Sequence, residues 1–486
     1  MHRLIGTVSG IAAFAGLAAL MIAGTAPTAR AQGAAAAAAK RNYKDNGEYD
    51  LYNQAFKDSQ NAAAQIKDLE TWAQKYPDSD YKDIRTGMLV QAYSNLVPLQ
   101  PAKVLEFAGQ LLAKDLKTVF DDPQDGKRQT LTFLYNATLA AGFAGTAGLP
   151  NPTAAQVDLW RSVARRLKDE TKAYFIPANK LAGASDADWA KARAGYDGVA
   201  DHTLLVLTIF PAEMVMAKTP RPASAECRDT AEPAYRRALT DYPEQAYVSY
   251  KLAQALQCQQ METPEKVFQA IYEFERAAVT DPTLGNPQAD ATKIPAFADK
   301  AYVNIHGSVD GLDELKQLVK RSALPPDNFK FKTAREIADE RQAEFEKTNP
   351  ELATWQKIKL FLTDPAAPNY FEEQLKDTEG PRLKGVVVDG ACRGKEILVA
   401  FPLPGQSGAL TPEVKLKFID SVLPGKPTPN TEITFDKAVA TAFTKEPFLL
   451  TMEVQKANPV EGLKTTPCVP PAPLKKNVPA PPPAKK

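Results

Sequence analysis

Apolar side chains recur at helical spacing through most of this chain and at strand spacing near its end. Between about residues 47 and 362 they return every three or four positions, which is the spacing of one face of an α-helix. The clearest example is Ala62–Tyr76, where Ile66, Leu69 and Trp72 fall on one face. This region is therefore predicted to be helical almost throughout.

Prolines divide this region into separate helices, because proline lacks an amide donor and restricts the residue before it. We expect one helix to break near Pro211 and another to break at Asn349-Pro350. The further helices predicted from the spacing are Tyr81–Leu96, Pro101–Lys114, Lys127–Ala141, Ala154–Tyr174, Ala187–Met216, Ser224–Tyr242, Gln245–Gln259, Ala296–Ile305, Leu312–Arg321 and Thr333–Leu362.

Near Pro381 the pattern changes to short runs of β-type residues separated by Gly and Pro turns. Val414–Phe418 alternates apolar and charged residues, as expected for a strand with one buried face. The predicted fold class is therefore mainly α, ending in a small all-β domain that is either an OB-like barrel or a sandwich. The five predicted strands contain Val386–Val388, Ile397–Phe401, Val414–Phe418, Ile433–Phe435 and Leu450–Val454.

The start of the chain has the pattern of a secretory signal peptide. Leu4–Gly24 is apolar and follows a short basic end, and the small-x-small sequence Ala29–Ala31 comes next. We expect cleavage between Ala31 and Gln32 and a periplasmic or secreted mature protein, with no stable membrane insertion after cleavage. The alternative is an uncleaved membrane anchor, because the apolar run approaches spanning length.

Composition shifts divide the rest of the chain. Six alanines at 34–39 and polar neighbours predict a poorly ordered lead-in, and seven prolines with four lysines predict an extended basic tail. The predicted division is 1–31 signal peptide, 32–46 lead-in, 47–362 helical region, 363–380 connector, 381–468 β-domain and 469–486 tail.

Charge and motifs argue against several classes of function. With 59 Lys and Arg against 58 Asp and Glu, the chain has no overall attraction to nucleic acid or to an anionic membrane. Beyond the start, the longest apolar run, Leu204–Phe210, is too short to span a bilayer. Three histidines and the lack of any recognisable catalytic or metal-binding motif predict no enzyme activity, no metal and no cofactor.

Four cysteines in an exported chain favour disulfides. Cys227 and Cys258 are equidistant from the predicted turn at Tyr242-Pro243, so antiparallel helices would place them at the open end of one hairpin. Two buried apolar thiols are the alternative for this pair. Cys392 and Cys468 bracket most of the predicted β-domain and form the second candidate pair.

Two stretches repeat one spacing of small, aromatic and proline residues: Ala231, Tyr235, Ala238 and Pro243, then Ala270, Phe274, Ala277 and Pro282. This spacing resembles the second helix of a tetratricopeptide repeat (TPR), in which small residues allow close helix packing. The resemblance implies an α-solenoid of TPR-like helical hairpins, which usually binds other proteins.

The same resemblance implies a concave groove lined by the first helix of each pair. It places Tyr247, Tyr250, Gln254 and Gln257 toward that groove, as a protein-binding surface. The alternative is that both tyrosines pack inside the core.

These features together predict a non-enzymatic scaffold or adaptor of the cell envelope that binds a protein or peptide partner, with no nucleic acid expected. A second hypothesis is that the β-domain binds an oligosaccharide or oligonucleotide through aromatic residues on one face. An enzyme with an unrecognised site is a third. The candidate aromatic residues of the β-domain are Phe401, Phe418, Phe435, Phe443 and Phe448.

Overall fold

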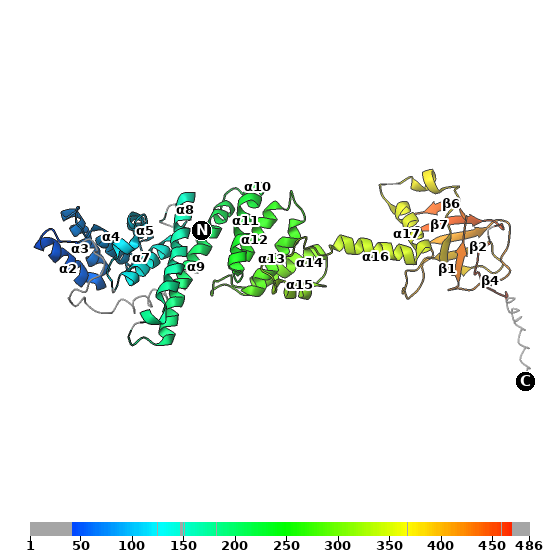
Figure 1. Ribbon diagram of the computed structural model, residues 1–486. Coiled ribbons are helices and arrows are strands. Elements are labelled where there is room, and N and C mark those ends of the chain that lie inside the picture. The colour runs from blue at the N-terminus through cyan, green and yellow to red at the C-terminus, as the bar shows by residue number, and fades with distance from the viewer. Residues whose placement is uncertain are drawn as a thin grey trace, which may run out of the picture. The chain divides into compact units, whose positions relative to one another are not determined.

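The computed structural model describes residues 41–468, except residues 124, 146–148, 150, 181, 367 and 458. The predicted signal peptide, its cleavage junction at Ala31 and Gln32, and the predicted tail lie outside these residues. The described chain is mostly helical, with a mixed β-sheet in its C-terminal part, as predicted (Figure 1). It forms two compact units that meet in sequence between Lys332 and Thr333.

The first unit contains only helices and turns among its described residues. Most consecutive helices pack against one another in chain order, from α2 through α5 and α7 to α9 and from α11 to α14. The helices are α2 (Asn46–Lys57), α3 (Ala62–Lys75), α4 (Lys82–Ser94), α5 (Pro101–Leu112), α6 (Leu116–Val119), α7 (Gly126–Ala141), α8 (Ala154–Tyr174), α9 (Asp186–Met216), α10 (Ser224–Glu226), α11 (Glu232–Asp241), α12 (Ala246–Gln259), α13 (Lys266–Thr280), α14 (Lys293–His306) and α15 (Leu312–Val319).

The predicted break near Pro211 is wrong, because α9 continues through this residue. Proline has no N–H, so the carbonyl of Leu207, four residues earlier, loses its partner within the helix. Arg161 of α8 replaces that partner, since its Nη2 donates a hydrogen bond to the Leu207 carbonyl oxygen at 2.7 Å. A neighbouring helix therefore supplies the donor that α9 lacks.

Helix α9 also meets, by length and composition alone, the criterion for a helix that could cross a membrane. The sequence did not predict this, because its longest apolar run in this helix, Leu204–Phe210, is too short to span a bilayer. In the structure α9 packs against α8 and α11, and Thr203 donates a hydrogen bond to the Thr138 carbonyl at 3.0 Å. Helices in the core of a protein meet the same criterion.

The two motif copies lie on buried faces of α11 and α13. A π-helical turn, Cys227–Ala231, precedes α11, and Pro233 occupies the first turn of that helix. The small and aromatic motif residues are almost completely buried, all except Ala277 in one core cluster, and both helices end before the motif prolines. The buried motif residues are Ala231, Tyr235, Ala238, Ala270, Phe274 and Ala277.

The second unit combines two helices with the sheet. Helix α16 begins at a capping box, in which Thr333 Oγ1 accepts from the Glu336 amide and the Glu336 carboxylate accepts from the Thr333 amide. Each of the five predicted strand runs falls in a strand, although Phe401 follows the end of β2, while β4, β6 and β8 were not predicted. The elements are α16 (Ala334–Thr348), α17 (Pro350–Thr363), a π-helical turn Phe371–Leu375, β1 (Leu383–Gly390), β2 (Glu396–Ala400), β3 (Val414–Phe418), β4 (Lys426–Pro427), β5 (Glu432–Phe435), β6 (Val439–Thr444), β7 (Leu449–Val454) and β8 (Thr465–Thr466).

Six strands form one mixed sheet in the order β5-β1-β2-β3-β7-β6. Strands β3 and β7 pair in parallel, with Leu416 opposite Met452, and the other neighbours are antiparallel. The alternation in β3 has the predicted effect, because Val414 and Leu416 are buried while Lys415 and Lys417 are more accessible. Strands β4 and β8 form a separate two-stranded ladder.

Helix α17 belongs to the core of the sheet, although it was predicted to be part of the helical region 47–362. Trp355 and Leu362 of α17 share one buried cluster with Leu383 and Val387 of β1. Helical spacing shows that α17 has an apolar face but does not show which core that face joins. For this reason the compact units divide before α16 and not at the predicted connector, 363–380.

Candidate functional site

The first helices of three successive hairpins line one groove in the helical unit. This N-terminal groove has a volume of about 330 Å³, and its walls come mainly from α2, α4 and α7. The lining residues combine aromatic and aliphatic side chains with uncharged amides and hydroxyls. They are Tyr52, Phe56, Ser59, Gln60, Gln65, Ile84, Gly87, Met88, Gln91, Phe120, Asp125, Arg128, Gln129, Thr132, Phe133 and Asn136.

Two glycines allow Phe120 to form part of the groove wall. A Cβ on Gly87 of α4 would lie 2.9 Å from Phe120 Cε1, and a Cβ on Gly126 would lie 2.2 Å from the Phe120 carbonyl oxygen. Both distances are shorter than van der Waals contact. Larger residues at these positions would therefore displace the ring of Phe120 or the backbone that carries it.

The charged side chains in the groove neutralise each other. Arg128 Nε lies 2.5 Å from Asp125 Oδ1, and Arg128 Nη2 lies 2.6 Å from Asp125 Oδ2. Gln129 donates a further hydrogen bond to Asp125 Oδ2 at 3.3 Å. These are the only acidic and basic residues among those that line the groove, so the groove carries no net charge.

Residues 41–43 pack against residues that lie in or beside the helices lining the groove. The Tyr43 ring stacks on Tyr81, just before α4, with ring centroids 4.4 Å apart, and lies 5.7 Å from the ring of Tyr52. Arg41 forms an ion pair with Asp121 at 2.6 Å, next to Phe120. This part of the predicted lead-in, 32–46, is therefore held by partners far away in sequence, which composition does not show.

The residues predicted to line a binding groove lie elsewhere. Tyr247 is partly buried and its hydroxyl donates a hydrogen bond to Glu213 Oε2 at 3.2 Å, while Tyr250 packs edge-on against Phe274. Gln254 is partly buried and Gln257 is exposed. The structure thus packs both tyrosines against the core formed by the motif helices.

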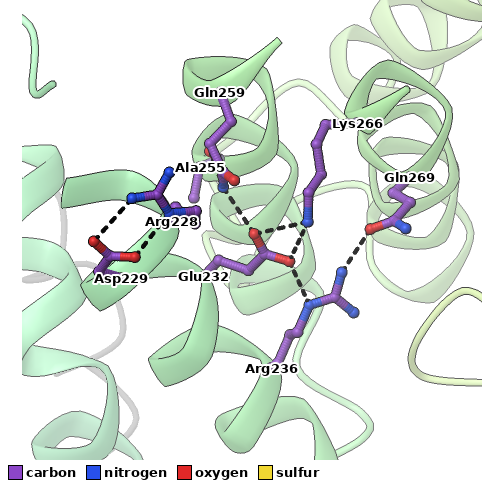
Figure 2. Close-up of polar contacts among 8 residues, drawn as sticks. All are labelled: Arg228, Asp229, Glu232, Arg236, Ala255, Gln259, Lys266 and Gln269. Atoms are coloured by element: carbon purple, nitrogen blue, oxygen red, sulfur yellow. Dashed lines mark hydrogen bonds and ion pairs between the residues drawn. The ribbon is translucent and has the colours of Figure 1, made fainter. Parts of the chain in front are cut away.

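A charged network joins the motif helices, and Figure 2 shows it around Glu232. The Glu232 carboxylate accepts hydrogen bonds from Arg236 at 2.8 Å, Lys266 at 2.9 and 3.1 Å, and Gln259 at 2.8 Å. Burial opposes ionisation, but the hydrogen bonds from Lys266, Gln259 and Arg236 lower the pKa of Glu232. Both oxygens are occupied, so this network fastens α11 to α12 and α13 and offers no vacant position for a ligand.

Both predicted cysteine pairs lie at disulfide distance. The Cα atoms of Cys227 and Cys258 are 6.3 Å apart, and those of Cys392 and Cys468 are 6.0 Å apart. The first pair links the π-helical turn before α11 to the end of α12. The second links the β1–β2 turn to the end of the described chain.

A second pocket, of about 460 Å³, lies in the sheet-containing unit. Phe401 and Phe448 line it, and Phe401 stacks on Trp355 with ring centroids 4.3 Å apart. Lys359 lies over the Phe448 ring and pairs with Glu413, which also accepts a hydrogen bond from Trp355 Nε1 at 2.7 Å.

The other predicted aromatic residues of this unit do not line that pocket. Phe435 is fully buried, and Phe418 and Phe443 pack against the same core. Only Phe401 and Phe448 of the five candidates therefore remain as pocket residues.

Among the described residues, no group of three or more His, Cys, Asp or Glu side chains is arranged to hold a metal ion. No protein-family model matches the chain, and no curated protein matches it either. The functional assignment therefore rests on the chain's own geometry.

Proposed function

We propose that this protein is a non-enzymatic scaffold whose helical unit binds a peptide segment of a partner protein. The observation that supports this most directly is the N-terminal groove, which is built from α2, α4 and α7 and lined by aromatic and amide side chains. Such side chains provide contact area at low entropic cost together with adaptable hydrogen bonds. The proposed binding surface therefore lies on the first hairpins and not on the motif helices.

The proposal includes a solenoid of TPR-type hairpins. It is supported by the packing of consecutive helices in chain order and by the buried motif residues on α11 and α13. In such a solenoid the first helix of each hairpin faces the concave surface. The helices α2, α4 and α7 are the first helices of the hairpins α2–α3, α4–α5 and α7–α8.

Site-specific photo-crosslinking in cells tests the proposed binding surface. A crosslinker at Gln91 should capture a recurrent protein, whereas one at exposed Gln257 should not. Phe56→Ala, which removes a groove ring that is 44% exposed, should abolish capture. Phe297→Ala, which removes an equally exposed ring outside the groove, should leave it unchanged. Equal capture at Gln91 and Gln257, or capture insensitive to Phe56→Ala, would overturn the proposal.

We also propose that the protein is exported to the cell envelope. The pattern of Leu4–Ala31 supports this, as do two cysteine pairs at disulfide distance, because disulfides persist in oxidising compartments. N-terminal sequencing of the protein from fractionated cells should find Gln32 as the first residue. A cytoplasmic protein that retains Met1 would contradict export.

A second candidate function is sugar binding by the pocket beside Phe448. Lys359, the one basic residue that lines this pocket, is paired with Glu413, so an oligosaccharide fits better than the phosphate backbone of an oligonucleotide. An OB-like barrel for this unit remains a prediction. A closed barrel would require the two edge strands of the sheet, β5 and β6, to approach each other. A glycan array on the whole protein, compared with a Phe448→Ala variant, tests the idea, and binding that survives this substitution would contradict it.

A further inference from the structure

The N-terminal groove brings aromatic and amide side chains together along parallel helices. Helices α2 and α4 both run antiparallel to α3. Between α3 and α2, Trp72 donates a hydrogen bond to Glu48, and Gln65 donates one to the Ala55 carbonyl, so the end of α3 lies beside the start of α2. Arg85, near the start of α4, donates a hydrogen bond to the carbonyl of Tyr76, just after the end of α3. Helices α2 and α4 therefore run parallel to each other.

Both helices contribute side chains to the groove. Ile84 comes from the first turn of α4 and Gln91 from its last turn, while Tyr52 and Phe56 lie in the second half of α2 and Gln60 in the 3-10 turn that follows it. Aromatic, aliphatic and amide side chains therefore lie together along the groove.

We infer that this groove takes an extended, uncharged peptide segment, with a large apolar side chain against the aromatic rings and its backbone against the amides. The inference rests on the proposed function and specifies the partner's chemistry. An amide side chain both donates and accepts hydrogen bonds, so it can pair with either group of a peptide backbone.

The length of the groove sets the length of the segment. Ile84 and Gln91 of α4 are seven residues apart, which corresponds to roughly 10 Å along the helix at about 1.5 Å per residue. An extended peptide covers this distance with about three or four residues, at roughly 3.3 Å each. The recognised core is therefore short.

Charge excludes the main alternatives. An acidic segment would need a cation, but Arg128 is engaged by both oxygens of Asp125. A basic segment would need the Asp125 carboxylate, which already has Arg128 and Gln129 as partners. Either would desolvate a charge without full compensation, and that costs several kcal/mol per ion. An uncharged segment avoids this penalty.

Selection from a displayed library of random dodecapeptides on the full-length protein tests the inference. Selected peptides should share a core of three or four residues that lacks Asp, Glu, Lys and Arg and contains one aromatic or large aliphatic residue. Gln91→Glu, which adds a negative charge among the groove amides, should weaken their binding at least about tenfold. Gln257→Glu, at an exposed position outside the groove, should leave binding unchanged.

The outcomes separate this inference from the proposed function. Charged peptides whose binding depends on Phe56 would overturn the inference and leave the groove as a binding site. Failure to enrich any peptide that depends on Phe56 or Gln91 would overturn both. The melting temperature of each variant, compared with that of the wild type, separates loss of binding from loss of folding.

Discussion

Buried carboxylates on neighbouring helices of the first unit have opposite environments. Glu232 accepts hydrogen bonds from two cations and an amide, and its pKa is lowered. Glu273 of α13 is completely buried, and neither of its carboxylate oxygens has a hydrogen-bond partner among the described residues. Burial raises the pKa of Glu273 to about 8, and that of Glu275 also to about 8. The same residue type thus stabilises the fold at one position and destabilises it at another.

Glu273→Gln should stabilise the protein at alkaline pH. With its pKa raised from 4.5 to about 8, Glu273 keeps a proton in the folded state that the unfolded chain releases, so stability falls as pH rises across that interval. Gln removes this dependence, and we expect a gain of about 1–3 kcal/mol at pH 8 and little change at pH 4. Urea unfolding at both pH values measures the difference. Exposed Glu262→Gln is the control, and an equal gain there would argue against the burial mechanism.

Glu232→Gln should have the opposite effect. Its lowered pKa means that the ionised group stabilises the fold above about pH 4.5, and that this contribution is lost as pH falls. The variant leaves Lys266 and Arg236 without a charged partner, so we expect a loss of about 1–3 kcal/mol at pH 7 that shrinks toward pH 3. Denaturation at several pH values checks this. A loss independent of pH would indicate a packing effect and not an electrostatic one.

Among the helices, α9 shows how a neighbour can compensate for an unfavourable residue. Proline inside a helix costs about 3 kcal/mol or more when the freed carbonyl has no other partner. Here the Leu207 carbonyl accepts a hydrogen bond from Arg161, so the helix continues through Pro211. The continuity of α9 therefore depends on α8.

A double-mutant cycle at Arg161 and Pro211 tests this dependence. Arg161→Ala should cost about 1 kcal/mol in the wild type, because the Leu207 carbonyl loses its donor. With Pro211→Ala, the restored amide can bond to that carbonyl, and Arg161→Ala should then cost much less. Urea unfolding of the four proteins gives the coupling energy. Additive effects would show that Arg161 contributes in another way, for example through its ion pair with Asp158.

For the whole molecule, the main structural result is the position of the boundary between the two units. Trp355, with 1% of its surface exposed, and Leu362 bring α17 into the core of the sheet. Trp355 also donates a hydrogen bond to Glu413, just before β3. The sheet therefore needs a helix that lies well before its first strand.

Fragments that begin at different residues test this boundary. Residues 333–468 should unfold cooperatively, because they retain Trp355, Leu362 and the sheet. Residues 381–468, the predicted β-domain alone, should not, because the apolar face of the sheet loses these partners. Circular dichroism during heating measures both. Equal, cooperative melting of the two fragments would show that α17 is dispensable. As a second test, Trp355→Ala in the longer fragment should lower the free energy of unfolding by about 3–5 kcal/mol.

The sequence by itself determined the type of most elements, because helix and strand spacing are local properties. Ala154–Tyr174 was predicted with the bounds that α8 has, and all five predicted strand runs fall in strands apart from Phe401, which follows β2. The cysteine pairs followed from their distance to one turn and from their number. The motif alanines and aromatics are buried, as small residues between close helices should be.

Only the tertiary structure decided which surfaces meet. An apolar stripe does not specify its partner, so the place of α17 on the sheet and the burial of Tyr247 and Tyr250 had no local signal. The N-terminal groove combines residues from three hairpins, and the segment before α2 is held by Asp121, 80 positions after Arg41. Likewise, the different environments of Glu232 and Glu273 arise from side chains that neighbouring helices bring together. Contacts of this kind depend on packing in space and leave no periodic pattern along the chain.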